Sequence, residues 1–466
     1  MLFSSLSFLY IFLPLVLVVY YLVPGKLKNF ILLAFSLLFY YIGEQKLVLL
    51  LLLSSVVDYT CSLGIERFRS KPGIPRLFLV LSLLVNISLL GYFKYVDLII
   101  RSINAILDTQ LNLLKVALPI GISFFTFQTM SYTFDVYRGD VKAEKNFLDF
   151  FTYVSLFPQL IAGPIVRYKT IAIELKERKF DLAAFGYGIS RFCIGLGKKI
   201  LIANTLAGVC KVYGEMPDKT TLITWVYAIA FSLQIYFDFS GYSDMAIGLG
   251  KLFGFSFPEN FNYPYIAKSV TEFWRRWHMT LGVWFRDYVY IPMGGNRVPA
   301  LRFILNILVV WSLTGLWHGA EYNFILWGLY YGLILLLEKF LLKKPLEKGR
   351  IMPHLYLLFI TLVGFILFDA PSVGDAIRTC GRLFGVGTIF TNTISTYYAK
   401  SYAFIIVIAS ILATPLMRSI YITAKKHRIG ERLRTVLEPV ACAVILIVST
   451  AYLVDGSYNP FMYFRF

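Results

Sequence analysis

The chain has 466 residues, of which 58% are hydrophobic and 17% aromatic, and its mean hydropathy is +0.68. Only 15% of its residues are charged, whereas a soluble domain carries about 25% charged residues. These values exclude a soluble globular protein and predict that the lipid bilayer is the solvent for most of the fold.

The formal net charge of +18 does not indicate nucleic-acid binding, because the basic residues fall in short loops between apolar segments and not along one face. The positive-inside rule of membrane proteins explains them instead. The cysteines are scattered and lack metal-ligand or C-x-x-C spacing, which predicts neither a disulfide framework nor a zinc site. They are Cys61, Cys193, Cys210, Cys380 and Cys442.

Apolar segments follow one another from the beginning of the chain. The stretch from Leu6 to Val23 resembles a signal peptide but lacks a positively charged leader and an A-x-A-like cleavage site, so we expect it to be the first membrane helix. The other segments give about a dozen in all, each approaching the length that a bilayer core requires. They lie near 29–43, 47–64, 77–100, 117–137, 183–202, 220–238, 300–317, 322–340, 355–369, 402–417 and 437–454.

Basic loops orient these segments, and we expect them to be cytoplasmic. Their residues are Lys26 and Lys28; Arg67, Arg69, Lys71 and Arg76; Lys176, Arg178 and Lys179; Lys343, Lys344, Lys348 and Arg350; and Arg418, Lys425, Lys426, Arg428, Arg432 and Arg434. The segment 370–400 is sparser in Lys and Arg. The alternation predicts that the N-terminus and the tail Tyr458-Asn459-Pro460-Phe461 lie outside.

Residues 239–299 interrupt the hydropathy pattern. They are rich in Gly, Pro, Trp, Arg and Tyr, too polar to face lipid and too aromatic for a disordered loop. Irregular backbone at membrane depth persists only where protein or a water-filled cavity surrounds it, so we expect a site there. No fixed-period repeat or long linker is visible, which predicts one integral domain over 1–466 with its signature region at 239–320.

Four histidines are candidates for proton transfer. His354 and His427 lie beside basic loops, which favours a solvated or headgroup-facing position. His278 and His318 lie within or beside apolar sequence, where an ionisable group by default indicates function. A neutral imidazole accepts a proton from a hydroxyl and returns it to a leaving group. We expect the small neighbours Gly315 and Gly319 to let substrate approach His318, although an interhelical hydrogen bond is the structural alternative.

Several sequence blocks are similar to those of a known family. They are Met1-Leu2-Phe3-Ser4-Ser5, Ile122-Ser123-Phe124-Phe125-Thr126-Phe127-Gln128, Phe157-Pro158-Gln159-Leu160-Ile161-Ala162-Gly163-Pro164-Ile165, Asp238-Phe239-Ser240-Gly241-Tyr242-Ser243-Asp244, Phe273-Trp274-Arg275-Arg276-Trp277-His278, Thr314-Gly315-Leu316-Trp317-His318-Gly319 and Asn459-Pro460-Phe461. With them the chain resembles the membrane-bound O-acyltransferase superfamily, and within it the bacterial alginate O-acetyltransferase branch. The two histidine blocks are the specific part of this resemblance.

The resemblance implies an all-α, polytopic integral membrane fold. Its expected features are about 11–13 membrane helices with re-entrant and short helices around a central tunnel. His318 matches the superfamily's catalytic histidine, and His278 matches its second signature position. The chain is expected to be an O-acyltransferase of the inner membrane.

Other residues of the signature region are candidates for lining the tunnel or binding the donor. Arg275, Arg276 and Arg286 suit the phosphates of an acyl-CoA donor, although topological charge also explains them. Asp238 and Asp244 suit the orientation of a histidine or an arginine, but a structural buried pair is the favoured interpretation of both. The aromatic candidates are tunnel walls or interfacial anchors, namely Trp274, Trp277, Trp284, Trp317, Tyr288 and Tyr290.

The favoured reaction moves an acetyl group from a cytosolic thioester, expected to be acetyl-CoA, through the tunnel for O-acetylation of an envelope polysaccharide such as alginate. No G-x-S-x-G elbow is present, so a serine relay inside this chain is disfavoured. The resemblance implies a secreted SGNH-type esterase-like partner instead. We expect no permanently bound cofactor, no metal and no nucleic-acid partner.

Two alternatives remain open at this point. A D-alanyl transfer protein of teichoic acid synthesis shares the architecture and the histidine pair but takes its acyl group from a carrier protein. A secondary transporter also has about a dozen helices and a polar break at membrane depth. The acceptor polymer, the acyl chain length and the oligomeric state do not follow from the sequence.

Overall fold

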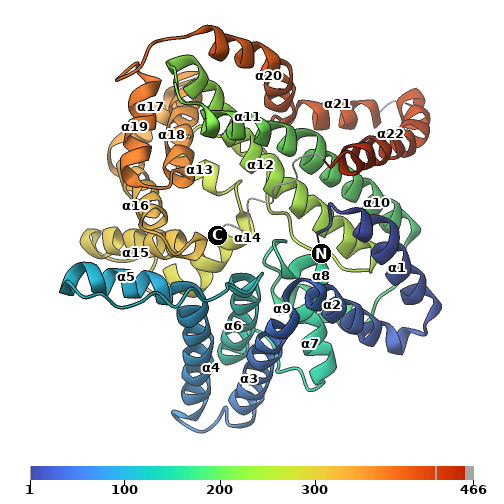
Figure 1. Ribbon diagram of the computed structural model, residues 1–466. Coiled ribbons are helices and arrows are strands. Elements are labelled where there is room, and N and C mark those ends of the chain that lie inside the picture. Colours follow the sequence, from blue (N-terminus) through green and yellow to red (C-terminus); the bar gives the residue numbers. More distant parts are fainter. Residues whose placement is uncertain (1, 426–427, 457–466) are drawn as a thin grey trace. The chain divides into compact units, whose positions relative to one another are not determined.

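A computed structural model describes residues 2–425 and 428–456 of the chain (Figure 1). Every secondary-structure element in these residues is helical, which confirms the predicted all-helical class. The chain forms two compact units, unit 1 with Met1–Phe192 and Met245–Pro258 and unit 2 with Cys193–Asp244 and Glu259–Phe466. Two boundaries fall within α10 (Leu182–Gly197) and α12 (Thr221–Leu252), and the third falls after α12, between Pro258 and Glu259. His427 and the predicted outer tail 458–461 lie outside the described residues.

Unit 1 is built mainly from the N-terminal helices. They are α1 (Leu13–Leu22), α2 (Lys28–Glu44), α3 (Val48–Arg67), α4 (Ile74–Leu90), α5 (Val96–Leu107), α6 (Ile122–Arg138), α7 (Phe147–Ser155), α8 (Phe157–Leu160) and α9 (Tyr168–Lys176), with π-helical turns at Phe8–Phe12 and Gly91–Tyr95 and 3-10 turns at Gly25–Leu27 and Gln45–Leu47. Figure 1 shows α3, α4 and α6 side by side, in mutual contact.

Unit 2 contains the remaining helices, including every element that carries the two signature histidines. They are α11 (Asn204–Glu215), α13 (Val270–Trp274), α14 (Met279–Phe285), α15 (Ala300–His318), α16 (Tyr322–Leu337), α17 (Lys343–Lys348), α18 (Met352–Asp369), α19 (Val373–Leu383), α20 (Thr393–Leu412), α21 (Leu416–Lys425) and α22 (Arg428–Val454), with π-helical turns at Lys198–Ala203, Arg286–Tyr290 and Glu338–Leu342 and a 3-10 turn at Pro264–Ile266.

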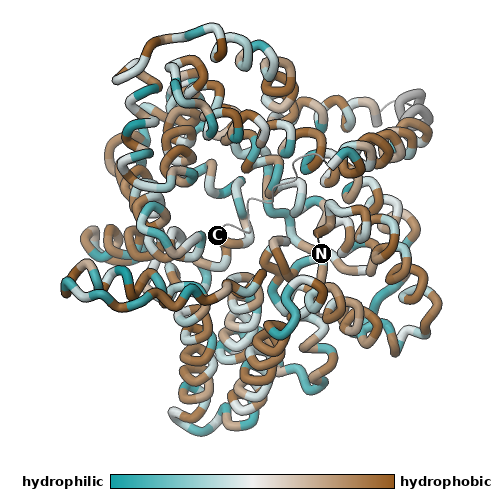
Figure 2. Tube along the Cα trace, viewed as in Figure 1, coloured by the Kyte–Doolittle hydropathy of each residue, from teal (hydrophilic) through white to brown (hydrophobic). Residues whose placement is uncertain are grey.

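The described residues contain nine helical runs long and apolar enough to cross a membrane. Figure 2 shows such hydrophobic stretches along α3, α4 and α15. The runs are Gly25–Arg67, Ile74–Leu107, Leu182–Glu215, Thr221–Leu252, Ala300–His318, Tyr322–Lys348, Met352–Asp369, Thr393–Leu412 and Thr435–Val454, with the shorter apolar helix Phe8–Leu22. These runs confirm a polytopic membrane protein. The sidedness of the loops stays a prediction.

Two features explain why these runs are fewer than the predicted segments. The segments at 29–43 and 47–64 are α2 and α3, which belong to one continuous run. The segment at 117–137 forms α6, whose buried Ser, Thr, Gln and Asp side chains lower its hydropathy. Polar side chains inside a helix bundle are tolerated when neighbouring helices satisfy them.

A polar cluster in unit 1 illustrates this packing. The buried carboxylate of Asp58 on α3 accepts hydrogen bonds from Ser82 and Asn86 on α4 and from Thr133 on α6. The Asn86 amide lies 3.0 and 2.9 Å from the two carboxylate oxygens. Since unpaired polar groups are costly away from water, these bonds specify how the three helices pair.

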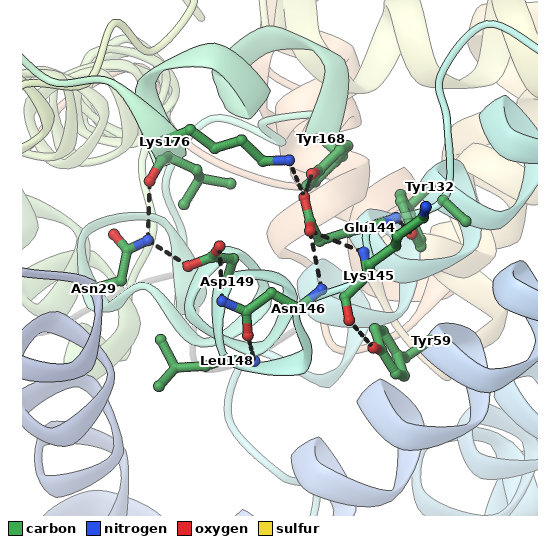
Figure 3. A network of polar contacts seen from close by, with 12 residues as sticks. Asn29, Tyr59, Tyr132, Glu144, Lys145, Asn146, Leu148, Asp149, Tyr168 and Lys176 are labelled. Atoms are coloured by element: carbon green, nitrogen blue, oxygen red, sulfur yellow. Dashed lines mark hydrogen bonds and ion pairs between the residues drawn. The ribbon is translucent and has the colours of Figure 1, made fainter. Parts of the chain in front are cut away.

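A second network surrounds Glu144, in the loop between α6 and α7 (Figure 3). Its carboxylate accepts a hydrogen bond of 2.7 Å from the Tyr168 hydroxyl and one of 3.0 Å from the backbone N–H of Asn146. The ammonium group of Lys176 lies 2.9 Å away. The loop is therefore bound to α9 through one carboxylate.

The irregular segment of the signature region begins later than the sequence suggested. Instead of breaking near residue 239, α12 continues to Leu252. Its carboxylates do not interrupt the helix because Asp238 pairs with Lys199 at 2.5 Å and Asp244 with Lys198 at 2.7 Å. Between α12 and α15 only short helical pieces remain, and His278 lies in the irregular stretch between α13 and α14.

Close packing of α15 against α16 positions the end of α15. A Cβ atom placed on Gly315 would lie 2.2 Å from the carbonyl oxygen of Phe324, and one on Gly319 would lie 2.2 Å from the Phe324 ring. A Cβ on Gly328 would lie 2.1 Å from the carbonyl oxygen of Trp311. The expectation that Gly315 and Gly319 admit substrate is therefore wrong: α16 fills the space beside them.

Candidate active site

His318 is the last residue of α15 and is buried, with 6% of its surface exposed. Its ring centroid lies 5.0 Å from that of Trp327 on α16 and 5.5 Å from that of Phe368 on α18. The close approach of α15 and α16 brings these aromatic rings together. The imidazole therefore lies in a largely apolar environment, where electrostatic interactions are strong.

His278 lies in the short irregular stretch before α14, with φ 43° and ψ 52°. A residue with a Cβ rarely adopts this left-handed conformation, and such backbone strain clusters at functional sites. Only 2% of the side chain is exposed. The ring packs edge-on against Phe239 of α12, with centroids 4.7 Å apart.

The structure brings the two signature histidines into one site. Their ring centroids are 6.5 Å apart, and the ring of Trp317 lies 5.0 Å from His318 and 5.5 Å from His278. His318 and Trp317 lie at the end of α15, and His278 lies in the loop before α14. The segments α14 and α15 separate them in the sequence. A common location is what a shared chemical role requires.

Asn260 is a site residue that the sequence reasoning missed. It is fully buried, and its side-chain oxygen lies 3.2 Å from Nδ1 of His278. The same oxygen accepts hydrogen bonds from the backbone N–H and the hydroxyl of Thr280, while the amide nitrogen donates to Ser243 at 3.2 Å. Nothing in the residues around position 260 marked it, because its role depends on a contact across the fold.

This hydrogen-bond pattern assigns the tautomer of His278. The side-chain atom of Asn260 that accepts from the Thr280 N–H must be the oxygen, so Nδ1 of His278 must carry the proton that it donates there. Burial and the neighbouring His318 hold the pKa of His278 well below its ordinary value of 6.5. His278 is therefore a neutral imidazole at neutral pH, with Nε2 as a hydrogen-bond acceptor.

The predicted aromatic residues divide into two groups. Trp274 packs against Trp311 and Trp327 and so adjoins the ring cluster that contacts His318. Trp277 is buried among Phe261, Phe273 and Phe365 as part of the core. The ring of the buried Tyr288 packs at a tilt against that of Trp284, with centroids 5.2 Å apart, while the Tyr290 hydroxyl donates to Asn296.

The predicted arginines have separate environments. Arg276 binds Glu272 through an ion pair of 2.8 Å and donates to the carbonyl oxygen of Asn262. Arg286 is 58% exposed and pairs with the adjacent Asp287. Arg275 is exposed. Arg276 therefore makes structural contacts with Glu272 and Asn262 that the sequence did not indicate.

The two aspartates of α12 pair with lysines. Asp238 binds Lys199 with both side chains almost fully buried, and Asp244 binds the partly exposed Lys198. Both lysines precede α11 in a π-helical turn. These ion pairs match the structural buried pairs that were favoured for both aspartates from the sequence. The lysines carried no recognisable sequence signal because their partners lie on another helix.

Other residues considered from the sequence lie elsewhere. His354 is half-buried, and its Nδ1 lies 3.2 Å from the carbonyl oxygen of Ala267, so it is more than a solvated residue. Within residues 2–425 and 428–456, no group of three or more His, Cys, Asp or Glu side chains is arranged to hold a metal ion. The five cysteines are not disulfide-bonded.

The helical membrane fold and the paired histidines define a membrane-embedded transferase, and comparison with known proteins gives its family. The chain belongs to MBOAT, the membrane-bound O-acyltransferase family, whose sequence profile matches residues 37–344. That range includes His278, His318 and Asn260. The chain is a multi-pass membrane O-acyltransferase.

Individual relatives are similar over much of the chain. The chain is 37% identical to the probable alginate O-acetylase AlgI of Pseudomonas putida over 487 residues, covering 100% of both proteins. It is 33% identical to the peptidoglycan O-acetyltransferase of Helicobacter pylori, over 84% of this chain and 81% of that protein. The teichoic acid D-alanyltransferase of Bacillus subtilis is 30% identical, over 46% of this chain and 58% of that protein.

Proposed function

We propose that the protein moves an acetyl group from a cytosolic thioester, acetyl-CoA, to O-acetylate a cell-envelope polysaccharide. The observation that carries this proposal is the buried pair of His278 and His318 at 6.5 Å in a membrane O-acyltransferase. Similarity to alginate O-acetylases and to a peptidoglycan O-acetyltransferase supports an envelope polysaccharide as the acceptor.

His318 acts as the general base in this proposal. Its imidazole accepts the proton of an acceptor hydroxyl while the hydroxyl oxygen bonds to the carbonyl carbon of the thioester. The carbon–sulfur bond then breaks, and the leaving thiolate takes the proton from the imidazolium. One ester and one thiol replace one thioester and one hydroxyl, and His318 returns to its neutral form.

His278 positions the reacting groups in the same proposal. Its Nδ1 donates its proton to the side-chain oxygen of Asn260, and this bond fixes the orientation of the ring beside His318. Orientation of this kind is worth a large part of a reaction barrier.

The acceptor hydroxyl belongs to the polysaccharide or to the serine of a secreted SGNH-type partner that completes the transfer. The absence of a G-x-S-x-G elbow from the sequence supports the partner. Transfer through a partner serine predicts that a secreted esterase-like protein is encoded beside this chain. Deletion of the gene for that protein should then abolish acetylation of the polymer.

D-alanyl transfer from a carrier protein is the alternative reaction. Similarity to a teichoic acid D-alanyltransferase supports it, but over less than half of this chain. Labelled acetyl-CoA and a labelled D-alanyl carrier protein, offered separately to membranes containing the protein, distinguish the two donors.

The principal experiment replaces His318. We expect His318→Ala to leave at most about 1% of polymer acetylation in cells, because a positioned base contributes roughly 10²–10⁴-fold to the rate. His278→Ala should impair transfer and leave measurable activity. Acetylated polymer is measured per amount of the protein in the membrane.

His354→Ala is the matched control, because it removes an imidazole outside the site and should retain close to normal activity. His318→Gln keeps a polar side chain of similar length and should be as inactive as His318→Ala. Normal acetylation by either His318 variant at equal membrane level would contradict the proposal. Loss of both variants from the membrane would favour a structural role for His318.

A further inference from the structure

A group of aromatic hydrogen-bond donors lies next to the His318 site. Within the described part of the chain, the indole N–H groups of Trp274 and Trp327 and the hydroxyl of Tyr331 are shielded from solvent and make no hydrogen bond. Trp327 is 2% exposed and Tyr331 is fully buried. Buried donors are nearly always satisfied in proteins, so a group of three calls for an explanation.

The three donors form one group. Ring centroids are 5.5 Å apart for Trp274 and Trp327, 4.9 Å for Trp274 and Tyr331, and 5.2 Å for Trp327 and Tyr331. Trp327 in turn contacts the ring of His318 at 5.0 Å. The donors therefore lie on mutually packed rings that begin at the proposed base.

The surroundings keep this group away from water and leave space for the hydroxyl. Phe368 packs against both Trp327 and His318. A Cβ atom placed on Gly364 would lie 2.3 Å from the hydroxyl oxygen of Tyr331. The absence of a side chain at position 364 therefore makes room for this hydroxyl. An apolar shell strengthens any hydrogen bond made inside it.

The chemistry of the group points to a particular ligand atom. Neutral N–H and O–H donors in a dry site suit a carbonyl oxygen, whereas a phosphate would require the arginine forks that bind it elsewhere in proteins. Donors aimed at an oxygen whose charge grows during reaction stabilise the transition state more than the ground state.

We propose that the Trp327 indole N–H, supported by the Tyr331 hydroxyl and the Trp274 indole N–H, binds the carbonyl oxygen of the acyl thioester and stabilises its negative charge during attack. This inference rests on the proposed function of the His318 site. The charge arises when the acceptor oxygen bonds to the carbonyl carbon and the C=O π electrons move onto the oxygen. It disappears when the C–S bond breaks.

Tyr331→Phe gives the sharpest test because it removes only the hydroxyl. If the Tyr331 hydroxyl lacks a partner until substrate binds, its burial destabilises the protein without substrate. Removing the hydroxyl should therefore make that protein more stable. We expect the melting temperature of the purified protein to rise by about 1–3 °C while polymer acetylation in cells falls about tenfold. A purely structural hydroxyl cannot produce these opposite changes.

Trp327→Phe tests the donor nearest His318. Its rate of acetyl transfer in membranes should fall about 10²-fold, with the KM for acetyl-CoA within about twofold of normal, because the interaction strengthens only in the transition state. A raised KM with an unchanged kcat would overturn a transition-state role.

Two variants serve as controls with satisfied donors. The hydroxyl of Tyr330, next to Tyr331 on α16, donates to the carbonyl oxygen of Ile360 at 2.9 Å. The indole of Trp225 donates to the carbonyl oxygen of Leu383 at 2.9 Å. We expect Tyr330→Phe and Trp225→Phe to lower the melting temperature slightly and to retain activity.

The outcomes separate this inference from the proposed function. If Tyr331→Phe behaves like Tyr330→Phe, with lower stability and normal activity, water or a ring face satisfies the hydroxyl and the inference is wrong. If His318→Ala remains active, the proposed function itself is wrong. If acetyl-CoA gives no transfer even with the unaltered protein, the donor is wrong, and acetylation in cells still compares the aromatic variants.

Discussion

The side-chain oxygen of Asn260 lies 3.2 Å from Nδ1 of His278 and also accepts two hydrogen bonds from Thr280. One buried amide therefore determines both the tautomer of the imidazole and the path of the strained backbone that carries it. Because His278 adopts a left-handed conformation, its ring depends on this support for its orientation.

Asn260→Ala should lower acetyl transfer by roughly 10²-fold, because a misplaced catalytic group loses most of its orientation advantage. The effect should appear in kcat, and the variant should still insert into the membrane. Rates in isolated membranes measure it, and the exposed Asn262→Ala is the matched control. Normal kcat in Asn260→Ala would show that the tautomer of His278 does not matter.

Arg275 and Arg276 are expected to respond differently to replacement. Arg276 is engaged by Glu272 and Asn262, so Arg276→Gln should lower the melting temperature. Exposed Arg275 is the better candidate for donor phosphates, and Arg275→Gln should raise the KM for acetyl-CoA with little change in kcat, as expected for uniform binding. A fall in kcat with an unchanged KM would count against a donor site at Arg275.

The Lys199–Asp238 ion pair should be important for stability. Both side chains are buried, with exposures of 1% and 4%, and removing one partner of a buried pair costs about 3–5 kcal/mol. Asp238→Asn should therefore reduce the free energy of unfolding strongly, as measured by denaturation in detergent.

Two companion variants complete this test. Asp244→Asn should cost less, because Lys198 is 24% exposed and water can solvate it. The double replacement Lys199→Met with Asp238→Leu should recover much of the stability, because no buried charge remains. Equal losses for Asp238→Asn and Asp244→Asn would contradict the role assigned to burial.

Stability should fall in acid through Glu144. Burial alone would raise the pKa of its carboxyl, but hydrogen bonds from Tyr168 and Asn146 and the nearby Lys176 hold the pKa below its ordinary value of 4.5. The unfolded chain therefore binds a proton first, and the stabilisation present above pH 4.5 is lost as the pH falls towards the lower folded pKa.

Melting temperatures between neutral pH and the acid side of 4.5 would measure this effect. Glu144→Gln should be less stable than the unaltered protein at neutral pH and should lose less stability on acidification. Glu177→Gln, a change of the same type beside α9, is the control. Parallel curves for the unaltered protein and Glu144→Gln would rule out this carboxylate as the source of the acid sensitivity.

The sequence by itself determined the membrane class, the positions of most helices and the two histidine blocks. Hydrophobic segments of bilayer length and the residues around His278 and His318 are local features, which a reading along the chain detects. The predicted break at 239 and the assignment of Gly315 and Gly319 to substrate approach were wrong because each depends on a partner elsewhere. Lysines satisfy the carboxylates of α12, and Phe324 fills the space beside the glycines.

Only the tertiary structure decided which groups share the site. Contacts between segments distant in sequence place His278 beside His318 and let Asn260 select one tautomer of His278. Such contacts also bury the unsatisfied donors of Trp327 and Tyr331. Hydrogen bonds and ring packing act over a few ångströms in space, whereas composition and periodicity record only neighbours along the chain. The roles of these residues therefore emerged when α12, α15, α16 and the loop before α14 were seen folded together.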